Sequence, residues 1–410
     1  MRSLRILIQR ELLEDLTSGR YILTSILCIF LCLTSIILMS DDYRRRLERY
    51  NFRMSDMNEQ RLRERLCFAK RPQPLSVMAR GVDEVMGRPL NITGWQPQEE
   101  PIAHVGGRSA TGNHLSGIGQ GQHLFELFTT PDFVYIVGMV LSALAIFLSF
   151  DKICGEKQTR TLSLLFSYSI RRWTLLFAKW VGGYISLVIS LCPAILIAFL
   201  YLTVFSGVSL QTEDWIRLPW ILGLSSLYLL VFFTLGLFAS TVTQRSSTSL
   251  ILVLSVWAIW VLGMPRIGCS VAKGLRPIQP NYTFGVEKRT MGSIDEYREE
   301  FWKMDDEYIA TVDEQISIGQ NLSRISPFAC YVYASSTLAK TGISDAQNFR
   351  QQVAEWDREN RRGKPMQLVM APLQLEQSLL VASTDMILLL AWNVLLLTGA
   401  NVAFLLYDIR

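Results

Sequence analysis

The sequence predicts an all-α membrane protein with six transmembrane helices. Half of the 410 residues are hydrophobic, and they gather in six runs. Most of these runs approach the ~20 residues that a helix needs to cross a ~30 Å hydrocarbon core. The formal net charge of +4 is too small at this length to indicate a nucleic-acid partner. The seven Cys form no CxxC pair, so neither a zinc site nor a disulfide scaffold is expected.

Residues 1–20 predict an amphipathic helix lying at the membrane interface. Leucine and isoleucine recur there at roughly helical spacing, and charged residues occupy many other positions. A frayed basic N-terminus is the alternative. The first span, 21–40, follows without a small-residue cleavage site, so no cleavable signal peptide is expected. The apolar residues of the helix are Leu4, Leu7, Ile8, Leu12, Leu13 and Leu16.

The segment 41–131 is polar and separates the first two spans. Its Arg-rich first part has no helix breaker as far as Lys70, so the first helix is expected to continue beyond the membrane. Pro, Gly and polar residues then predict loops and a small irregular subdomain. The Gly-rich stretch from Gly117 to Gln122 lacks the Lys-Ser/Thr of a phosphate-binding loop. We therefore do not expect this chain to hydrolyse ATP.

All three histidines lie in this segment and form the only hint of a metal site. They would become ligands if their imidazoles converged, with a carboxylate or Cys67 completing the shell. Spacings of ten and nine residues in a Gly-rich loop do not preorganise such a site. A solvated loop without metal is the favoured interpretation. The weak metal candidates are His104, His114 and His123.

Five further spans follow the first polar segment. Pro193 lies inside the third span and predicts a kink there. A second polar segment, 266–378, separates the last two spans. Together with 41–131 it is expected to form a mostly helical extracytoplasmic domain. The five spans are predicted at 132–150, 180–205, 219–240, 249–265 and 379–407.

Opposite charges connect the two long polar segments. Residues 43–71 contain ten basic and four acidic side chains, whereas residues 287–314 contain ten acidic and four basic ones. The hypothesis is that two helices lie side by side, with charge setting their register, because exposed ion pairs contribute only ~0–1 kcal/mol each. Two independently solvated helices are the alternative.

The connector 151–179, between the second and third spans, is rich in basic residues. It contains six Lys or Arg against two acids, and a basic loop between spans is typical of the cytoplasmic side. Alternation of small polar and Leu or Phe residues from Thr161 to Ser169 favours a short helix at the membrane surface. Six spans place both termini on that same side. The Arg-rich start of 41–131 conflicts with this orientation, but long loops are largely exempt from the charge rule.

No sequence pattern indicates an enzyme. HExxH, GxSxG and paired carboxylates within an apolar span are all missing from the sequence. The last span carries Asp385 at its outer edge and two deeper asparagines, Asn393 and Asn401. For the asparagines, helix packing is favoured over a role in lining a path.

The connector resembles the cytoplasmic loop of ABC-2 type transporter permeases, which read like D-x-I-x-G-E-K-E-x-G-T-L-x-L-L-L-S-x-P-V-S-R. Arg160 and Ser169 depart from the family's Gly and Pro. Residues 1–20 look like the elbow helix of the family, and the segment from Arg324 to Trp356 is similar to part of a bacterial subgroup with a large helical ectodomain. The matching connector residues are Asp151, Ile153, Gly155, Glu156, Lys157, Thr161, Leu162, Leu164, Leu165, Ser167, Arg171 and Lys179.

This resemblance implies a permease subunit in the cell inner membrane, with both termini cytoplasmic. Such permeases pair with a second copy or a homologous permease and bind a separate ABC ATPase, which holds ATP and Mg²⁺. No cofactor is expected in this chain, and its other expected partners are membrane lipid and a periplasmic protein. The connector would supply a coupling helix that docks into a groove of the ATPase. The expected contact residues are Glu156, Lys157, Thr161, Leu162, Leu165 and Arg171.

Two functions of different classes stay open at this point. The first is a permease that uses a partner's ATP to export a substrate or to transmit force across the membrane. The alternative is a membrane-anchored sensor or assembly scaffold with a helical ectodomain. Co-purification of an ATP-binding subunit would separate the two.

Overall fold

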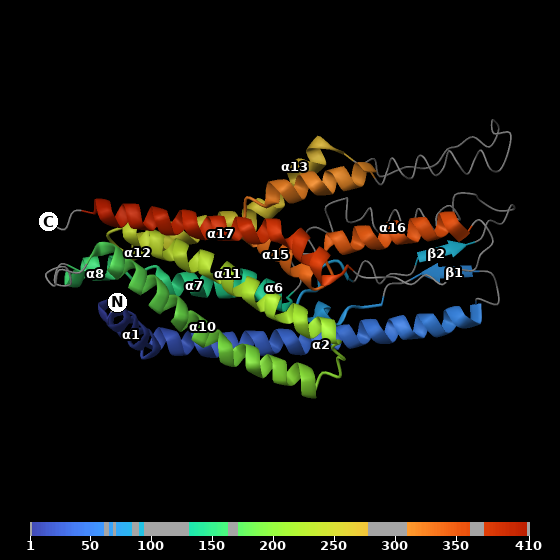
Figure 1. The fold of residues 1–410 in the computed structure, drawn as a ribbon, viewed down its shortest axis with the longest axis horizontal. Helices are drawn as coiled ribbons and strands as arrows, with labels where there is room; N and C mark the ends of the chain where they lie inside the picture. The colour runs from blue at the N-terminus through green and yellow to red at the C-terminus, as the bar shows by residue number, and fades with distance from the viewer. Residues whose placement is uncertain are drawn as a thin grey trace.

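The computed structural model describes residues 2–60, 65–68, 71–83, 90–93, 131–162, 171–277, 310–360 and 373–407. Six of the described helices are long and apolar enough to cross a membrane, which confirms the predicted all-α membrane fold. Figure 1 shows these helices running along the long axis of the molecule, with both termini at one end. We call this end the connector end because α8 also lies there, and we call the opposite end the loop end.

Helix α1 (Arg2–Leu16) turns at residues 17–18 into α2 (Gly19–Gln60). With 42 residues, α2 is about 63 Å long, so the first span does continue well beyond a ~30 Å hydrocarbon core. The predicted helix stops short of Lys70, because Arg65–Phe68 forms strand β1, antiparallel to β2 (Leu90–Thr93). Strand β1 is stabilised by hydrogen bonds to β2, which lies further along the chain. Local helical propensity does not reveal such a partner.

Two of the spans contain a π-helical turn. The second span consists of α6 (Phe133–Tyr135), the π turn η3 (Ile136–Leu141) and α7 (Ser142–Ser149). The fifth span consists of α12 (Ser246–Ala258), the π turn η4 (Ile259–Gly263) and α13 (Met264–Leu275). The fifth span therefore extends beyond the predicted 249–265 at both ends.

The other three spans are unbroken helices. They are α10 (Arg172–Val204), α11 (Thr212–Val242) and α17 (Leu375–Leu406). Helix α10 begins eight residues before the predicted third span, so residues 172–179 are helical rather than part of a loop. Pro193 lies inside α10 without ending it.

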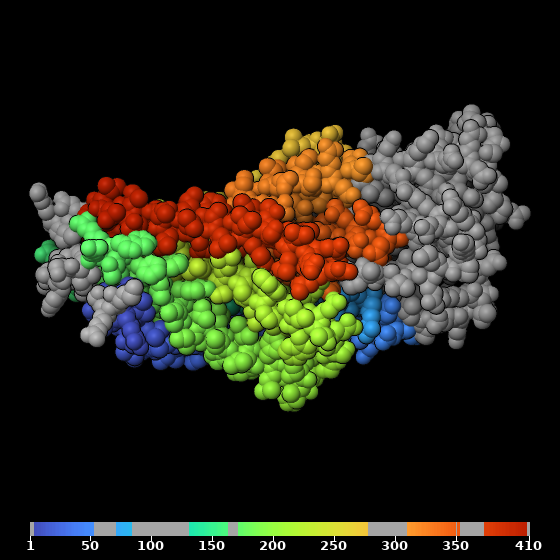
Figure 2. Space-filling model, viewed as in Figure 1, coloured from blue at the N-terminus to red at the C-terminus, as the bar shows by residue number. Residues whose placement is uncertain are grey.

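Helix α11 occupies the centre of the bundle. In its most apolar window 67% of the residues are buried, against 17% for the fifth span. Tyr228, Phe232 and Phe233 of α11 are fully buried. Helix α11 packs against both α7 and α17, and Figure 2 shows α17 (red) along one face of the molecule beside α10 and α11 (green).

The second long segment contributes helices at the loop end. Residues 310–323 are helical and are followed by α15 (Pro327–Leu338) and α16 (Ile343–Asn360). Every residue of α15 is buried, and α15 packs between α11 and α17. Part of the predicted outer domain thus lies inside the bundle. The short 3-10 helix η2 (Pro74–Val77) packs on α2.

Most of the charge-paired segment 287–314 lies outside the described residues, so that hypothesis stays a prediction. In the described part, Arg45 pairs with Asp41 and Arg46 with Asp42 along α2. Arg46 also pairs with Asp83, which follows η2. These basic residues therefore have partners within the first polar segment itself.

Candidate functional site

The connector folds back onto the helices that flank it. After α7, residues 150–153 turn into α8 (Cys154–Gln158). Arg160 then adopts a left-handed backbone conformation with φ of 59°, at the position where the resemblance of the connector predicts Gly. Gly would adopt this conformation without the ~1–2 kcal/mol penalty of other residues. Residues 161–162 are helical, and α10 follows from Arg172.

Lys179 joins three elements in one buried ion-pair cluster. Its Nζ lies 2.8 Å from Glu11 Oε1 of α1 and 2.8 Å from Glu156 Oε1 of α8. The Lys179 side chain is only 3% exposed. Removing one member of a buried ion pair leaves its partner uncompensated and costs about 3–5 kcal/mol. The cluster therefore ties α1, α8 and α10 together.

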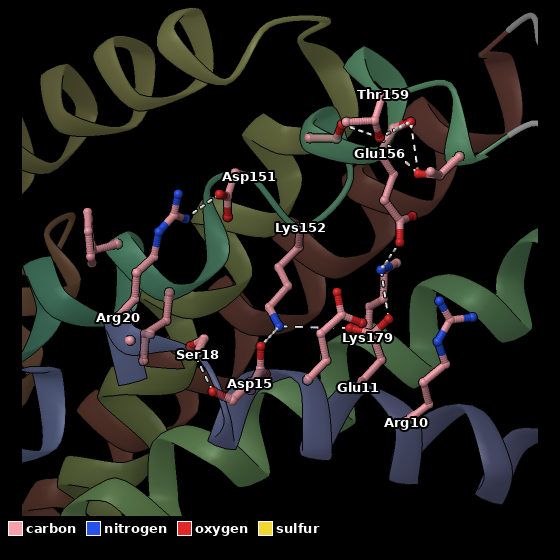
Figure 3. A pocket seen from close by; sticks show the side chains of 16 residues that line it. Arg10, Glu11, Asp15, Ser18, Arg20, Asp151, Lys152, Glu156, Thr159 and Lys179 are labelled. Carbon is pink, nitrogen blue, oxygen red and sulfur yellow. Dashed lines mark hydrogen bonds and ion pairs between the residues drawn. The ribbon is translucent and has the colours of Figure 1, made fainter. Parts of the chain in front are cut away.

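Three further ion pairs lie on the same side of the connector. Lys152 pairs with Asp15 of α1, and its Nζ is 3.8 Å from Glu11 Oε2. Arg20, at the start of α2, pairs with Asp151. Figure 3 shows these side chains converging from α1, α2 and the connector. The connector is thus fastened to the N-terminal helices by ion pairs.

The orientation of α1 differs from the simple amphipathic pattern. Glu11 and Asp15 point toward α10 and the connector, whereas Ile6 and Leu13 are exposed on the opposite face. Gly182 of α10 allows this close approach, since a Cβ there would lie 2.9 Å from Cβ of Glu11. Apolar spacing predicted the helix but not its inward acids. The sequence feature that could have indicated this orientation is the spacing of Glu11 and Asp15. Two acids four residues apart lie on one face of a helix, where they can pair with the basic residues of the connector.

Lys157 caps the connector end of α11. Its Nζ donates to the carbonyl oxygens of Thr241 at 2.5 Å and Thr243 at 3.0 Å. It also lies 4.5 Å from the ring centroid of Tyr407, directly after α17. The last carbonyls of a helix lack internal partners and carry partial negative charge, so an ammonium group stabilises them. Lys157 therefore links the connector to the ends of α11 and α17.

Leu162 belongs to a buried apolar cluster at the connector end. It is 3% exposed, so its side chain packs within this chain. Nearby, Ser240 Oγ accepts hydrogen bonds at 2.9 Å from the backbone N–H groups of Ile153 and Cys154. The buried residues that share the cluster with Leu162 are Ile153, Leu175, Leu176, Leu237, Ala400 and Phe404.

The exposed part of the predicted contact set is smaller than the sequence indicated. Thr161 and Arg171 are exposed on the connector, and Leu165 lies outside the described residues. The remaining three predicted residues have partners within this chain: Glu156, Lys157 and Leu162.

A cleft of about 790 Å³ separates α1 from the connector. It is bounded by the ion pairs described above, and Figure 3 shows Arg10 and Thr159 at its margin. Its walls carry both cations and carboxylates, so the cleft is polar. Its charged lining residues are Arg10, Glu11, Glu14, Asp15, Arg20, Asp151, Lys152, Glu156 and Lys179.

The described residues contain no group of three or more His, Cys, Asp or Glu that could hold a metal ion. His104, His114 and His123 lie outside them. In the last span, Asn393 Nδ2 donates to Leu389 O at 3.1 Å, and Asn393 Oδ1 accepts from Thr234 Oγ1 at 3.3 Å. These contacts fit the helix-packing role expected for Asn393.

Comparison with known proteins identifies a family. The family described as "ABC-2 family transporter protein" matches residues 5–409, nearly the whole chain. A search of curated proteins finds no match.

Proposed function

Because the chain belongs to the ABC-2 transporter family and is a membrane permease component of an ABC transporter, we propose that its connector end receives force from a separate ATPase. The ATPase subunit would bind ATP and Mg²⁺, since the sequence has no phosphate-binding loop. The permease itself would be non-catalytic and would convert a push on the connector into movement of its helices.

The Lys179 cluster is the observation that carries this proposal. One nearly buried ammonium group contacts carboxylates from α1 and α8 while it belongs to α10 itself. Packed helices joined in this way shift as rigid units. A displacement of α8 therefore moves α1 and α10 together.

The connector also reaches the two helices at the centre of the bundle. Lys157 holds the end of α11 and faces Tyr407 after α17. Arg172 Nη1 donates to Leu405 O at 2.7 Å, which joins the start of α10 to the end of α17. The exposed residues Thr161 and Arg171 then form the surface where an ATPase would push. The cleft between α1 and the connector supports the same docking position, because it is open and lined by charge.

The proposal includes an orientation and an assembly. The connector end would be cytoplasmic and the loop end extracytoplasmic, in the cell inner membrane. A second copy or a homologous permease would pack beside this chain. The low burial of the fifth span supports this, because one chain leaves most of that helix uncovered. Both export of a substrate and force transmission to a periplasmic partner are compatible with the proposed coupling.

Replacing Lys179 with Met tests the proposal in the complex with an ABC ATPase encoded beside this chain. We expect the ATPase to co-purify with the variant, because the exposed surface is unchanged. Stimulation of ATP hydrolysis by the permease in nanodiscs should fall about tenfold or more. Arg245→Gln is the matched control, since Arg245 is an exposed basic residue at the same end.

Loss of Lys179 leaves two buried carboxylates, so the triple variant Lys179→Met, Glu11→Gln, Glu156→Gln is also needed. A neutral, well-packed cluster is often as stable as the ionic one. The triple variant should fold and still be uncoupled. Full stimulation in both variants would contradict the proposed coupling. Failure of any ABC ATPase to bind the unaltered permease would favour the sensor or scaffold function instead.

A further inference from the structure

A helical hairpin from the second long segment enters the loop-end half of the bundle. Residues 310–323 run along α13 toward the bundle, and α15 leads back out. The contact with α13 is close: a Cβ at Gly268 would lie 2.3 Å from Ser323 Oγ. The turn between the two helices, residues 324–326, forms the tip of the hairpin.

An ion pair holds this tip to the last span. Arg324 Nε lies 2.8 Å from Asp385 Oδ1, and Arg324 Nη1 donates to Asn321 Oδ1 at 2.9 Å. The Asp385 side chain is only 2% exposed. The carboxylate of this pair is therefore shielded from solvent, whereas the Arg324 side chain is 23% exposed.

The sequence predicted Asp385 at the outer edge of the last span, but we infer a deeper position for the ion pair. Trp is enriched at membrane interfaces, so we place the interface at the loop end near the exposed Trp215 and Trp220 of α11. Between them in sequence, Arg217 contacts Ser378 of α17 at 2.9 Å. Asp385 lies seven residues further along α17, about 10 Å deeper at the helical rise. Charged groups at such depth are costly and are typical of functional sites.

The rest of α15 is fixed by contacts that contain no full ion pair. Tyr331 stacks on Tyr228 with ring centroids 4.4 Å apart, and Ser225 Oγ lies 2.8 Å from the Tyr331 hydroxyl. At the outer end, Arg217 donates to Leu338 O at 3.1 Å. These contacts hold α15 in the bundle without a charged side chain of α15 itself. They therefore do not account for the charged pair at the tip of the hairpin.

Both π turns contact the hairpin near its tip. Ser326 Oγ donates to Trp260 O of η4 at 2.5 Å. Phe328 packs against Gly138 of η3, where an added Cβ would lie 2.3 Å from the ring. π turns are rare and frequently occur at functional sites. The spans beside the tip thus have a local geometry that can change when the hairpin moves.

We propose that residues 310–338 form a gate at the loop end and that Arg324 and Asp385 are its latch. The structure shows the latched position, in which α15 fills the space between α11 and α17. Movement of the hairpin breaks the ion pair and uncovers the inner face of α15. The latch is a property of this chain alone, whereas its opening by ATP rests on the proposed function.

Cys330 provides a native reporter for the gate. It is fully buried on α15, and its Sγ lies 3.1 Å from Arg324 O. N-ethylmaleimide labelling of the purified permease, read for each cysteine by mass spectrometry, measures its exposure. Asp385→Asn should raise the labelling rate of Cys330 at least tenfold. The milder Arg324→Lys keeps the charge but loses part of the contact, and should give a smaller rise.

Cys28 and Cys32 are buried on α2 and report on the fold as a whole. They should stay unlabelled in both latch variants. Arg276→Gln is the matched control, because it removes an exposed ion pair with Glu314 near the start of the same hairpin. It should label like the unaltered protein. The latch would be wrong if Cys330 stayed protected in both variants, or if it became labelled only together with Cys28 and Cys32.

The complex with the ATPase tests how the gate is driven. Cys330 labelling should rise during ATP hydrolysis in the unaltered complex and should not rise in the Lys179→Met complex. A rise in the latch variants of the free permease without any effect of ATP would support the latch and contradict the proposed coupling. If Cys330 labelling rose with ATP but was unchanged by both latch variants, the latch alone would be contradicted.

Discussion

Lys179 is charged although almost none of its side chain is exposed. Such a residue is stable only when its partners are both close and hydrogen-bonded. Glu11 and Glu156 meet this condition from two different helices. No local sequence pattern reveals this cluster, because 168 residues separate Glu11 from Lys179. Spacing along one helix predicts only neighbours on that helix.

Gly138 shows how one missing side chain allows α15 to lie inside the bundle. Its carbonyl accepts a hydrogen bond from the Tyr228 hydroxyl at 2.7 Å. A Cβ on Gly138 would lie 2.3 Å from Cε2 of Phe328. The ring belongs to a fully buried helix, so it has little room to move.

Gly138→Ala is therefore expected to destabilise the protein by about 1–3 kcal/mol through overpacking. The measurement is the thermal unfolding midpoint in detergent. Gly223→Ala is the matched control in a neighbouring span, since a Cβ at Gly223 meets nothing within 4 Å. Ala is a better helix former than Gly, so the control should be neutral or slightly stabilising. Equal midpoints for the two variants would contradict the close contact.

Helix α2 runs uninterrupted from the connector end into the loop-end domain. At its connector end Arg20 pairs with Asp151. Further along the helix, beside η2, Arg46 contacts Asp83 at 2.6 Å and Ser76 at 3.0 Å. One helix is thus anchored both at the connector and beside η2. Its hydrophobic run predicted the span, but only contacts with η2 and the residues after it show where the helix is anchored.

Neighbouring arginines on α2 should differ sharply in their effect on stability. Arg46 is 5% exposed, and its loss leaves the buried Asp83 carboxylate without this partner. Arg46→Ala should cost about 3–5 kcal/mol. Arg45, 72% exposed, pairs with Asp41, and Arg45→Ala should cost about 0–1 kcal/mol. Thermal unfolding of the two variants in detergent measures the difference, and similar losses would show that the Arg46 cluster does not stabilise the fold.

The whole molecule has two chemically distinct ends. The connector end holds both termini, the Lys179 ion-pair cluster and the cleft (Figures 1 and 3). The loop end holds α15, α16 and the small strand pair (Figure 1). In the proposed mechanism, force enters at the first end and the gate opens at the second.

Accessibility in intact cells tests the proposed orientation. Ser209 and Gln244 are exposed residues in short loops at the loop end and the connector end, respectively. In a Cys67→Ser background, Ser209→Cys should react with a membrane-impermeant maleimide from outside. Gln244→Cys should react only after permeabilisation, because the basic connector end is expected in the cytoplasm. The reverse pattern would invert the orientation and place the ATPase site on the wrong side.

Hydropathy and spacing along the chain were enough to predict the six spans, the N-terminal helix and the extension of α2. These features follow from local chemistry, because a helix crossing a hydrocarbon core must be long, apolar and internally hydrogen-bonded. The basic character of the connector, and its resemblance to one family, were visible for the same reason. No contact between distant residues was needed for any of them.

The inward face of α1, the caps formed by Lys157 and the burial of α15 arise only when distant segments meet. Six residues were predicted to face an ATPase, and that contact stays a prediction. Three of them, Glu156, Lys157 and Leu162, have partners within this chain that the sequence did not indicate. A Lys, Glu or Leu on a surface helix has the same sequence signature whether its partner is another protein or its own fold. Which partner it has depends on how the helices pack, since burial and ion pairing act between side chains that are close in space rather than in sequence.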